Sequence, residues 1–283
     1  MRKQNMKKVT SFIWIFLLFP SFAQAAFDNC GSSAKTLSLG NASIAMTDES
    51  ACFFTNPGAL GFLQHKGFQA SLSRLFDLDE LSEREFYAAF PFRSFSLGGG
   101  WYTFGKSNYY QESVLSFAFA YKVKDHVSFG SNFKYMRVSF SSEYDALSAF
   151  SIDVGSTYKV NHRFQLGFVA RNLNQPELVK NSDDIPTIFS FGLAVFPLPE
   201  VTLLFDLSYE ERYKEQLHLG QEIKLLKNLP LRFGIQTSPA RYAFGVGFNF
   251  DKLVFYYAYS NHSVLGDTHK ISFSFCWGRK KTE

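Results

Sequence analysis

The sequence lacks three features that would place it in familiar classes of protein. It has no apolar run of about 20 residues, the length that a membrane-spanning helix needs, so we do not expect a helical membrane protein. Its net charge is only +4 and its basic residues are dispersed, which excludes the basic stripe of a nucleic-acid-binding protein. The spacings of a zinc site, a phosphate loop and a dinucleotide fingerprint are also missing. We therefore expect no metal, no cofactor and no nucleic acid partner.

The first 25 residues have the layout of a cleavable export signal. Basic residues open the chain, residues 12–22 are apolar, and residues 23–25 (Ala-Gln-Ala) form a small-residue cleavage site, so we expect residues 1–25 to be removed. Cysteine is scarce, with three in the chain. In an oxidising compartment Cys30 and Cys52 are the candidates for a disulfide, which leaves Cys276 odd.

Aromatic residues, in contrast, are abundant. They make up 18% of the chain, with 34 Phe and 14 Tyr, although hydrophobic residues total only 46%. A transmembrane barrel has this balance because alternate residues face lipid while the others face a polar lumen. In residues 201–209 the apolar residues at odd positions alternate with Thr202, Asp206 and Ser208. The pattern predicts an all-β fold, a transmembrane antiparallel β-barrel.

Segments with this two-residue period number about fourteen, an even number as in single-chain outer-membrane barrels. The expected strands cover residues 67–76, 84–91, 96–104, 113–121, 127–140, 149–159, 164–173, 187–196, 201–210, 216–226, 231–237, 241–250, 253–260 and 268–277. We expect residues 67–278 to form the barrel, residues 26–66 an N-terminal periplasmic or plug segment, and residues 279–283 a C-terminal tail.

The connections between these strands alternate in length. Those after odd-numbered strands tend to be long and polar, such as 105–112 and 174–186, whereas those after even-numbered strands are tight, such as 197–200 and 251–252. Outer-membrane barrels have short periplasmic turns and long outer loops. We therefore expect a bacterial outer-membrane protein with both chain ends on the periplasmic side.

The polar face of the predicted strands carries charges and glycines. A lipid-facing Arg or Lys would cost roughly 2–4 kcal/mol at mid-membrane, so we expect the charges to face the lumen, where they pair or line a pore. These lumen-facing charges are Lys134, Asp153, Arg171, Asp206, Glu222, Arg232 and Lys270. The glycines mark either curvature of the wall or close approach of an internal plug, and both interpretations stay open. They are Gly130, Gly155, Gly167, Gly192, Gly220, Gly234, Gly245 and Gly247.

The most specific motif lies in residues 30–61. A Gly-containing stretch precedes an acidic residue, two aromatics and the element Asn56-Pro57-Gly58-Ala59-Leu60. The region resembles the N-terminal signature shared by the FadL-type channels, TodX-like proteins included, and the PorV/PorQ proteins, although their Ala-Gly order after Asn-Pro is reversed here. The resemblance implies a plugged outer-membrane barrel with a ligand or plug role for this element. The residues alone favour an elbow between plug and first strand, because Pro57 disfavours the α region at Asn56.

Three consecutive glycines, Gly98, Gly99 and Gly100, lie in the third predicted strand. Such a run favours a kink or bulge that interrupts the ladder locally. FadL-type channels have a kinked third strand that opens the wall sideways, so the resemblance implies a lateral gate here. The alternative is that the wall only approaches the plug closely at these positions.

Potential catalytic side chains gather near the last outer loop. They are Ser260, His262, Ser263, Asp267 and His269. A nucleophile and its base must lie within hydrogen-bond reach, and no barrel-enzyme signature surrounds these residues. We therefore expect no enzymatic activity.

The leading functional hypothesis is a channel or receptor for small hydrophobic molecules, embedded in outer-membrane lipid, as the FadL resemblance implies. The alternative, which the PorV/PorQ resemblance implies, is a non-transporting barrel that acts as a partner or shuttle for secretion-system proteins. An open porin is disfavoured because several apolar residues, Val169, Leu204 and Val254 among them, are predicted to face inward.

Overall fold

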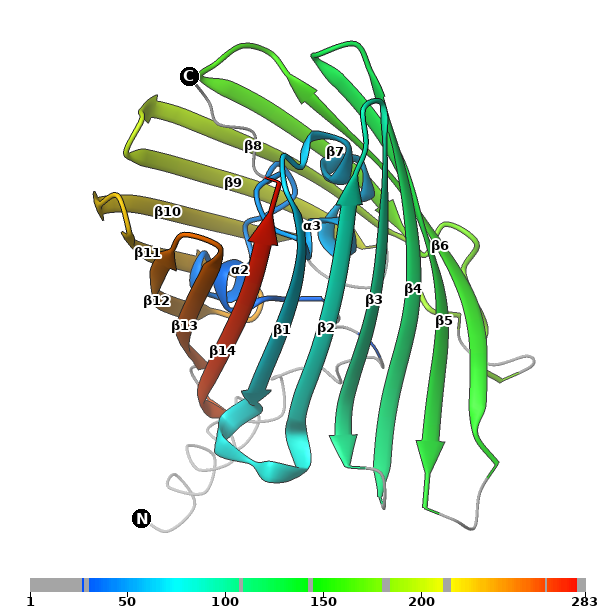
Figure 1. The fold of residues 1–283 in the computed structure, drawn as a ribbon. Helices are drawn as coiled ribbons and strands as arrows, with labels where there is room; N and C mark the ends of the chain where they lie inside the picture. The colour runs from blue at the N-terminus through cyan, green and yellow to red at the C-terminus, as the bar shows by residue number, and fades with distance from the viewer. Residues whose placement is uncertain are drawn as a thin grey trace, which may run out of the picture.

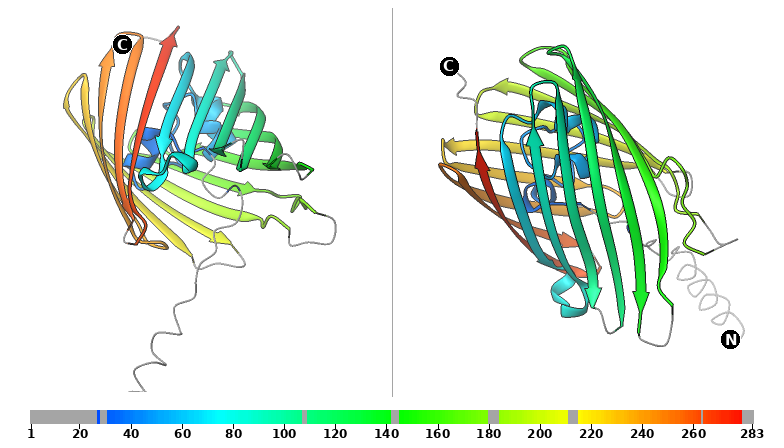
Figure 2. Two further views of the ribbon diagram at one scale, coloured as in Figure 1. Left: turned by 90° about the horizontal axis from the view of Figure 1, so that it is seen from below. Right: turned by 45° about the vertical axis from the view of Figure 1, so that its right-hand side comes forward.

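The structure, a computed structural model, describes residues 27, 31–106, 109–141, 145–179, 184–210, 215–262 and 264–278. Within them, fourteen strands form a closed antiparallel barrel, and β1 completes the ring by pairing with β14 (Figures 1 and 2). The strands are β1 Lys66–Arg74, β2 Ser82–Pro91, β3 Phe95–Lys106, β4 Tyr110–Val123, β5 Val127–Phe140, β6 Leu147–Lys159, β7 Phe164–Arg171, β8 Ile188–Leu198, β9 Val201–Glu210, β10 Gln216–Leu226, β11 Leu229–Gln236, β12 Arg241–Phe250, β13 Leu253–His262 and β14 Gly266–Trp277. Closure gives every strand a hydrogen-bonded neighbour on both sides, because open sheet edges are not tolerated in hydrocarbon.

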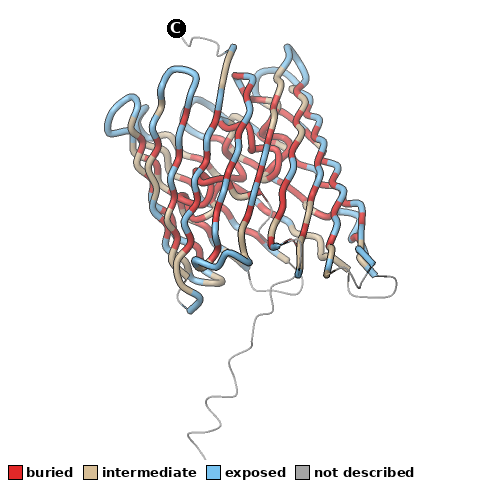
Figure 3. The backbone as a smooth tube through the Cα atoms, turned by 60° about the horizontal axis from the view of Figure 1, so that its bottom comes forward, coloured by how far each residue is buried: buried red, intermediate tan, exposed pale blue. Residues whose placement is uncertain are grey.

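The predicted fold class is confirmed. All fourteen expected strands are present, and their ends differ from the prediction by at most three residues. Alternation made them recognisable, because buried and exposed residues follow one another along each strand (Figure 3). In β5, for example, Phe129 and Phe133 are exposed while Asn132 and Lys134 are buried.

The short helices are not membrane spans. No helix in the described part of the chain is both long enough and apolar enough to cross a bilayer. Helices α2 (Ala34–Ser38) and α3 (Cys52–Thr55) and the 3₁₀ helix η1 (Pro57–Phe62) lie inside the barrel (Figure 1). Two further 3₁₀ turns, η2 (Leu75–Asp77) and η3 (Asp79–Leu81), belong to the connection between β1 and β2.

Residues 31–65, here called the N-terminal segment, follow the inner wall of the barrel. The amide of Ala34 donates to Ser272 on β14, and the segment then passes β12, β11, β10, β9, β8 and β7 in turn. Its second half, α3 and η1, packs against β3, β4, β5 and β6. The N-terminal segment thereby lies within the ring of strands (Figure 2).

The beginning of the described chain lies at the end of the barrel opposite to the expected one. The amide N–H of Phe27 donates to Oε2 of Glu112 at 3.0 Å, and Glu112 is near the start of β4, at the end with the long connections. Strand β14 ends at Trp277, beside the tight turns. The expectation that both chain ends lie on the periplasmic side is therefore wrong for the N-terminal side. Counting strands that alternate in direction shows at which end of the barrel each strand ends. It gives no such information for a segment that forms no strand.

Candidate functional site

The inward glycines of the wall are where the N-terminal segment docks. A Cβ atom would approach or overlap atoms of this segment at seven of the eight positions, so the interpretation of close backbone approach holds there. Gly167 and Gly192 face Ile44 and Ala45, for instance, while Gly220 and Gly234 face Leu39 and Gly40. Gly247 is the exception, because its nearest neighbours are wall residues. Glycine is needed at these positions because a side chain on the wall would occupy the space of the segment's backbone.

Asn56 ties the Asn-Pro element to the rest of the interior. Its Nδ2 donates to the carbonyl of Ile44 at 2.8 Å and to the carbonyl of Ser156 on β6 at 3.1 Å. Its Oδ1 accepts from the amide of Gly58 at 2.9 Å, which caps η1. One buried side chain thus links two parts of the N-terminal segment to the wall.

The reversed Gly58-Ala59 order has a steric reason. A Cβ at Gly58 would lie 2.6 Å from Cα of Ser156, so an alanine at position 58 would collide with the β6 backbone. Pro57 opens η1, and Ala59 and Leu60 are completely buried. The element therefore forms the elbow that leads from α3 toward the first strand.

Asp206 on β9 holds the middle of the N-terminal segment. Its Oδ2 accepts hydrogen bonds from the amides of Ser43 and Ile44, the latter at 2.9 Å. Only 1% of the residue is exposed. On the neighbouring strand β10, Nδ1 of His218 lies 2.8 Å from the carbonyl oxygen of Gly40, so adjacent strands hold adjacent turns of the segment.

A chain of charges connects α2 to the wall near the tight turns. Lys35 forms an ion pair with Asp48, and its Nζ lies 4.0 Å from Glu222, whose Oε2 accepts from Nε of Arg232 at 2.7 Å. Burial acts to lower the pKa of the Lys35 ammonium, but Asp48 and Glu222 outweigh it and hold the pKa above its ordinary value. The lysine therefore stays charged and serves to anchor α2.

The other inward charges are also engaged. Lys134 pairs with Asp153 at 2.8 Å and donates to the side-chain oxygen of Asn172. The backbone N–H of Asn172 in turn donates to Asp153. Lys270 bridges Glu83 at 2.9 Å and Glu85 at 2.7 Å. These side chains therefore form ion pairs inside the barrel.

Arg171 is the remaining predicted charge. It contributes to the wall of a small cavity of about 40 Å³ near the outer end, beside Phe27 and Phe54. This cavity is too small for an organic ligand, since ligand pockets span about 300–1,000 Å³.

A cavity of about 430 Å³ lies near the tight turns. Its apolar wall combines Leu39 and Met46 of the N-terminal segment with Ala194, Phe196 and Leu204 of β8 and β9. Its charged side chains include Lys35, Asp48, Lys159, Glu222 and Lys224. Strand parity predicts that Leu204 and Glu222 face inward, but it does not place them beside Met46 or Phe196. Extending the parity of β8 inward from Gly192 would have found Phe196, whereas nothing in the sequence placed Met46 there.

The three glycines of β3 do not interrupt the sheet. Pairing of Gly98, Gly99 and Gly100 with β2 and β4 continues without a register shift, so the predicted kink or bulge is wrong for this structure. Gly98 and Gly100 point inward against Phe53 and Phe54, while Gly99 points outward. The aromatic rings of α3 occupy the space that side chains at 98 and 100 would fill. The structure therefore agrees with the alternative that the wall approaches the N-terminal segment closely at these positions.

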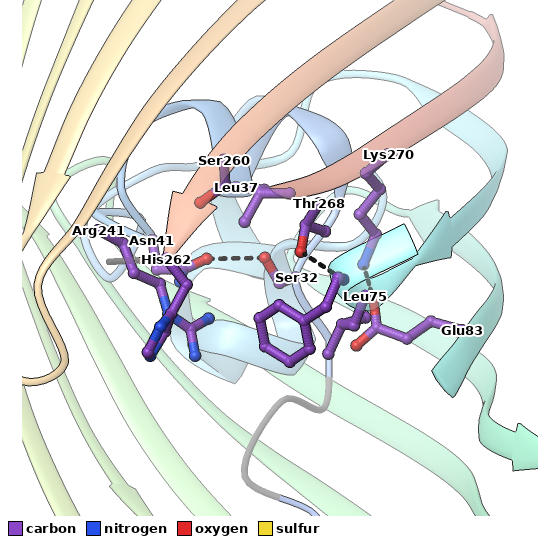
Figure 4. Close-up of a pocket in the computed structure, with 11 residues that line it drawn as sticks. Ser32, Leu37, Asn41, Leu75, Glu83, Arg241, Ser260, His262, Thr268 and Lys270 are labelled. Carbon is purple, nitrogen blue, oxygen red and sulfur yellow. Dashed lines mark hydrogen bonds and ion pairs between the residues drawn. The ribbon is translucent and has the colours of Figure 1, made fainter. Parts of the chain in front are cut away.

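The potential catalytic cluster is divided by the wall. Ser260 and His262 face inward and border a cavity of about 30 Å³ beside Arg241 (Figure 4). His269 and Asp267 face outward, where they contact Tyr257 and Tyr259 at 2.7 and 2.9 Å. Ser263 lies outside the described residues. The described members therefore do not converge on one site, and no group of three or more His, Cys, Asp or Glu able to hold a metal occurs among the described residues.

Two of the three cysteines, Cys52 and Cys276, belong to the described residues. Cys52 is buried in α3, and Cys276 borders a cavity of about 100 Å³ near the tight turns. Cys30 and the expected export signal, residues 1–25, lie outside the described residues, so the pairing of Cys30 with Cys52 stays a prediction.

A closed ring of strands with exposed apolar side chains, and with charges paired inside, defines a transmembrane β-barrel of the outer-membrane class. Its fold is the FadL/TodX-like one. A deltaS2 mutant of the TodX monoaromatic hydrocarbon channel is 13% identical, with a TM-score of 0.69 over 88% of this chain and 99% of that chain. A Pseudomonas aeruginosa FadL homologue, 13% identical, gives 0.66 over 88% and 98%.

The Ralstonia pickettii toluene transporter TbuX is similar as well. It is 11% identical, with a TM-score of 0.63 over 88% of this chain and 98% of that chain. At the sequence level, no protein-family model and no curated protein matches the chain. The likeness is thus one of fold, retained at low sequence identity.

Proposed function

We propose that this chain is an outer-membrane channel for small hydrophobic molecules and that its N-terminal segment is the plug. The observation that carries the proposal is the cavity of about 430 Å³ whose apolar wall is built jointly by that segment and by β8 and β9. This volume falls within the range of about 300–1,000 Å³ typical of small-molecule sites. A ligand there would contact both the fixed wall and the segment that fills the lumen.

The fold supports the same substrate class. Two of the similar structures are a monoaromatic hydrocarbon channel and a toluene transporter. The proposal assigns residues 1–25 to an export signal, 26–66 to the plug region and 67–278 to the barrel. The secretion-partner alternative gains no support from these structures and is not carried further.

A cavity-filling variant tests the proposal. Ala194 is fully buried and borders the cavity, so Ala194→Phe should fill part of the ligand volume without charge or backbone change. The matched control is Val195→Phe, one residue along β8 on the outward face. Uptake of toluene would be compared in cells that express each variant and otherwise lack a hydrocarbon channel.

We expect Ala194→Phe to lower toluene affinity at least tenfold, about 1.4 kcal/mol, and uptake with it. Val195→Phe should behave as the unaltered protein. Equal uptake by both folded variants would remove the cavity from the pathway. Equal uptake by cells with and without the unaltered protein would overturn the channel function itself.

A further inference from the structure

The outer face of β2 to β6 carries two rows of directly paired residues with opposite character. One row consists of Phe86, Trp101, Leu115, Tyr135 and Phe150, all of them exposed. The next row toward the long connections consists of Arg84, Thr103, Ser113, Arg137 and Ser148. The surface thus changes from aromatic to basic and hydroxylic within two residues on five neighbouring strands.

This change marks a height in the membrane. Two residues along a strand span about 7 Å before tilt is considered. Aromatic side chains of barrels concentrate at the interfaces of the hydrocarbon layer, and the long connections lie outside the cell. The basic row therefore lies at the level of the headgroups of the outer leaflet.

The two arginines are available to a ligand. Both are exposed, and neither guanidinium forms an ion pair with any described residue. Arg74, in contrast, is on the same side of the barrel but is engaged with Asp79 at 3.1 Å. No carboxylate occurs in the row, so nothing within it competes with an external anion.

The spacing limits what can bind. Arg84 and Arg137 are separated by three strand-to-strand steps, about 14 Å in all. This is too far for one phosphate to bridge comfortably, but each arginine has a hydroxyl residue directly opposite it, Thr103 for Arg84 and Ser113 for Arg137. Ser113 is partly exposed, whereas Thr103 is covered. A headgroup with two separated phosphates matches this arrangement, since guanidinium groups bind phosphate through paired hydrogen bonds.

We propose that Arg84 and Arg137 form a binding site for a glycolipid of the outer leaflet that carries two phosphates. The acyl chains of that lipid lie over the aromatic row, and the phosphates lie at the basic row. The site is independent of the lumen and of the proposed transport. It fixes the height and the orientation of the barrel in an asymmetric membrane.

The test uses the full barrel, purified in a neutral detergent, and lipid A with two phosphates as the probe. The melting temperature is measured with this lipid and with the same lipid after removal of its phosphates. We expect the phosphorylated lipid alone to raise the melting temperature of the unaltered protein. Arg84→Gln and Arg137→Gln should each lose about half of this rise, and the double variant nearly all of it.

The control is Arg163→Gln, which removes an exposed arginine from the tight turn between β6 and β7 at the other end of the barrel. It should keep the full rise. Migration on an unboiled detergent gel verifies that each variant is folded. The proposal is overturned if the folded double variant keeps the full rise, if the phosphate-free lipid stabilises equally, or if neither lipid stabilises the unaltered protein.

Discussion

Oδ1 of Asn56 occupies the space that a side chain at Gly155 would need. The same oxygen accepts from the amide of Gly58, and the Nδ2 of Asn56 donates to Ile44 and Ser156. The glycine of the wall and the asparagine of the N-terminal segment are therefore two halves of one joint.

Replacing Asn56 with Ala should loosen the N-terminal segment. The change removes four hydrogen bonds and leaves buried carbonyl and amide groups without their partner, at a cost of about 1–3 kcal/mol. The melting temperature should fall, and limited proteolysis should cut the segment faster than in the unaltered protein. Asn228→Ala, in the exposed turn between β10 and β11, is the control. Unchanged cleavage in Asn56→Ala would show that the joint does not hold the segment.

Two glycine variants should separate the inner from the outer face. Gly155→Val places its side chain against Asn56 and Pro57, and overpacking of this kind costs about 1–3 kcal/mol. Gly99→Val points outward, where the nearest neighbour is the carbonyl oxygen of Ser116 at 3.9 Å, so it should be neutral or slightly stabilising. The melting temperatures of the two variants are compared, and only that of Gly155→Val should fall. Equal destabilisation would contradict the assigned faces.

The pair of Lys35 and Asp48 should make the interior sensitive to acid. Desolvation acts to raise the pKa of Asp48, but attraction to Lys35 outweighs it and lowers the pKa from 3.8 to about 2. A carboxylate whose pKa is lower in the folded than in the unfolded chain stabilises the fold at pH values above its unfolded pKa. This contribution is lost as pH falls from about 4 through 2. Because the Asp48 side chain is 60% exposed, solvent screens the pair and its contribution is below about 1 kcal/mol.

Asp48→Asn tests this pair. The drop in melting temperature between pH 6 and pH 3 should be smaller in the variant than in the unaltered protein, because the variant lacks the carboxylate that is protonated in this range. An equal drop in both proteins would assign the acid sensitivity to other carboxylates.

Locking the N-terminal segment to the wall should block transport if the segment must move. A Cβ at Gly220 would lie 3.3 Å from Cβ of Ala42, slightly below the range of about 3.5–4.5 Å for a disulfide, but only 2.8 Å from the carbonyl oxygen of Leu39, so residues 39–42 must shift away from β10 to accept Ala42→Cys with Gly220→Cys. In a background without the native cysteines, oxidation should abolish toluene uptake and reduction should restore it. Full uptake by the oxidised protein would mean that cargo passes without displacement of this part of the plug.

Much of the barrel could be predicted from its residues, but the contents of the lumen could not. The fourteen strands followed from alternation, and inward Asp153, Asp206 and Glu222 followed from parity. The partners of these carboxylates did not: Asp206 binds backbone amides at 43 and 44, which no pattern of side chains indicates. The three glycines of β3 were misread as a kink for the same reason, since their explanation lies in Phe53 and Phe54 from another part of the chain.

By itself the sequence determined the faces of the strands, because a side-chain period of two leaves only one arrangement that keeps phenylalanine in lipid and carboxylates out of it. It also determined the ring, since unpaired strand edges are not tolerated in hydrocarbon. Only the tertiary structure decided where the N-terminal segment runs, which glycines receive it and where a cavity remains. Those outcomes depend on contacts between residues a hundred or more positions apart, such as Asn56 with Ser156 and Thr157, and local periodicity carries no information about them.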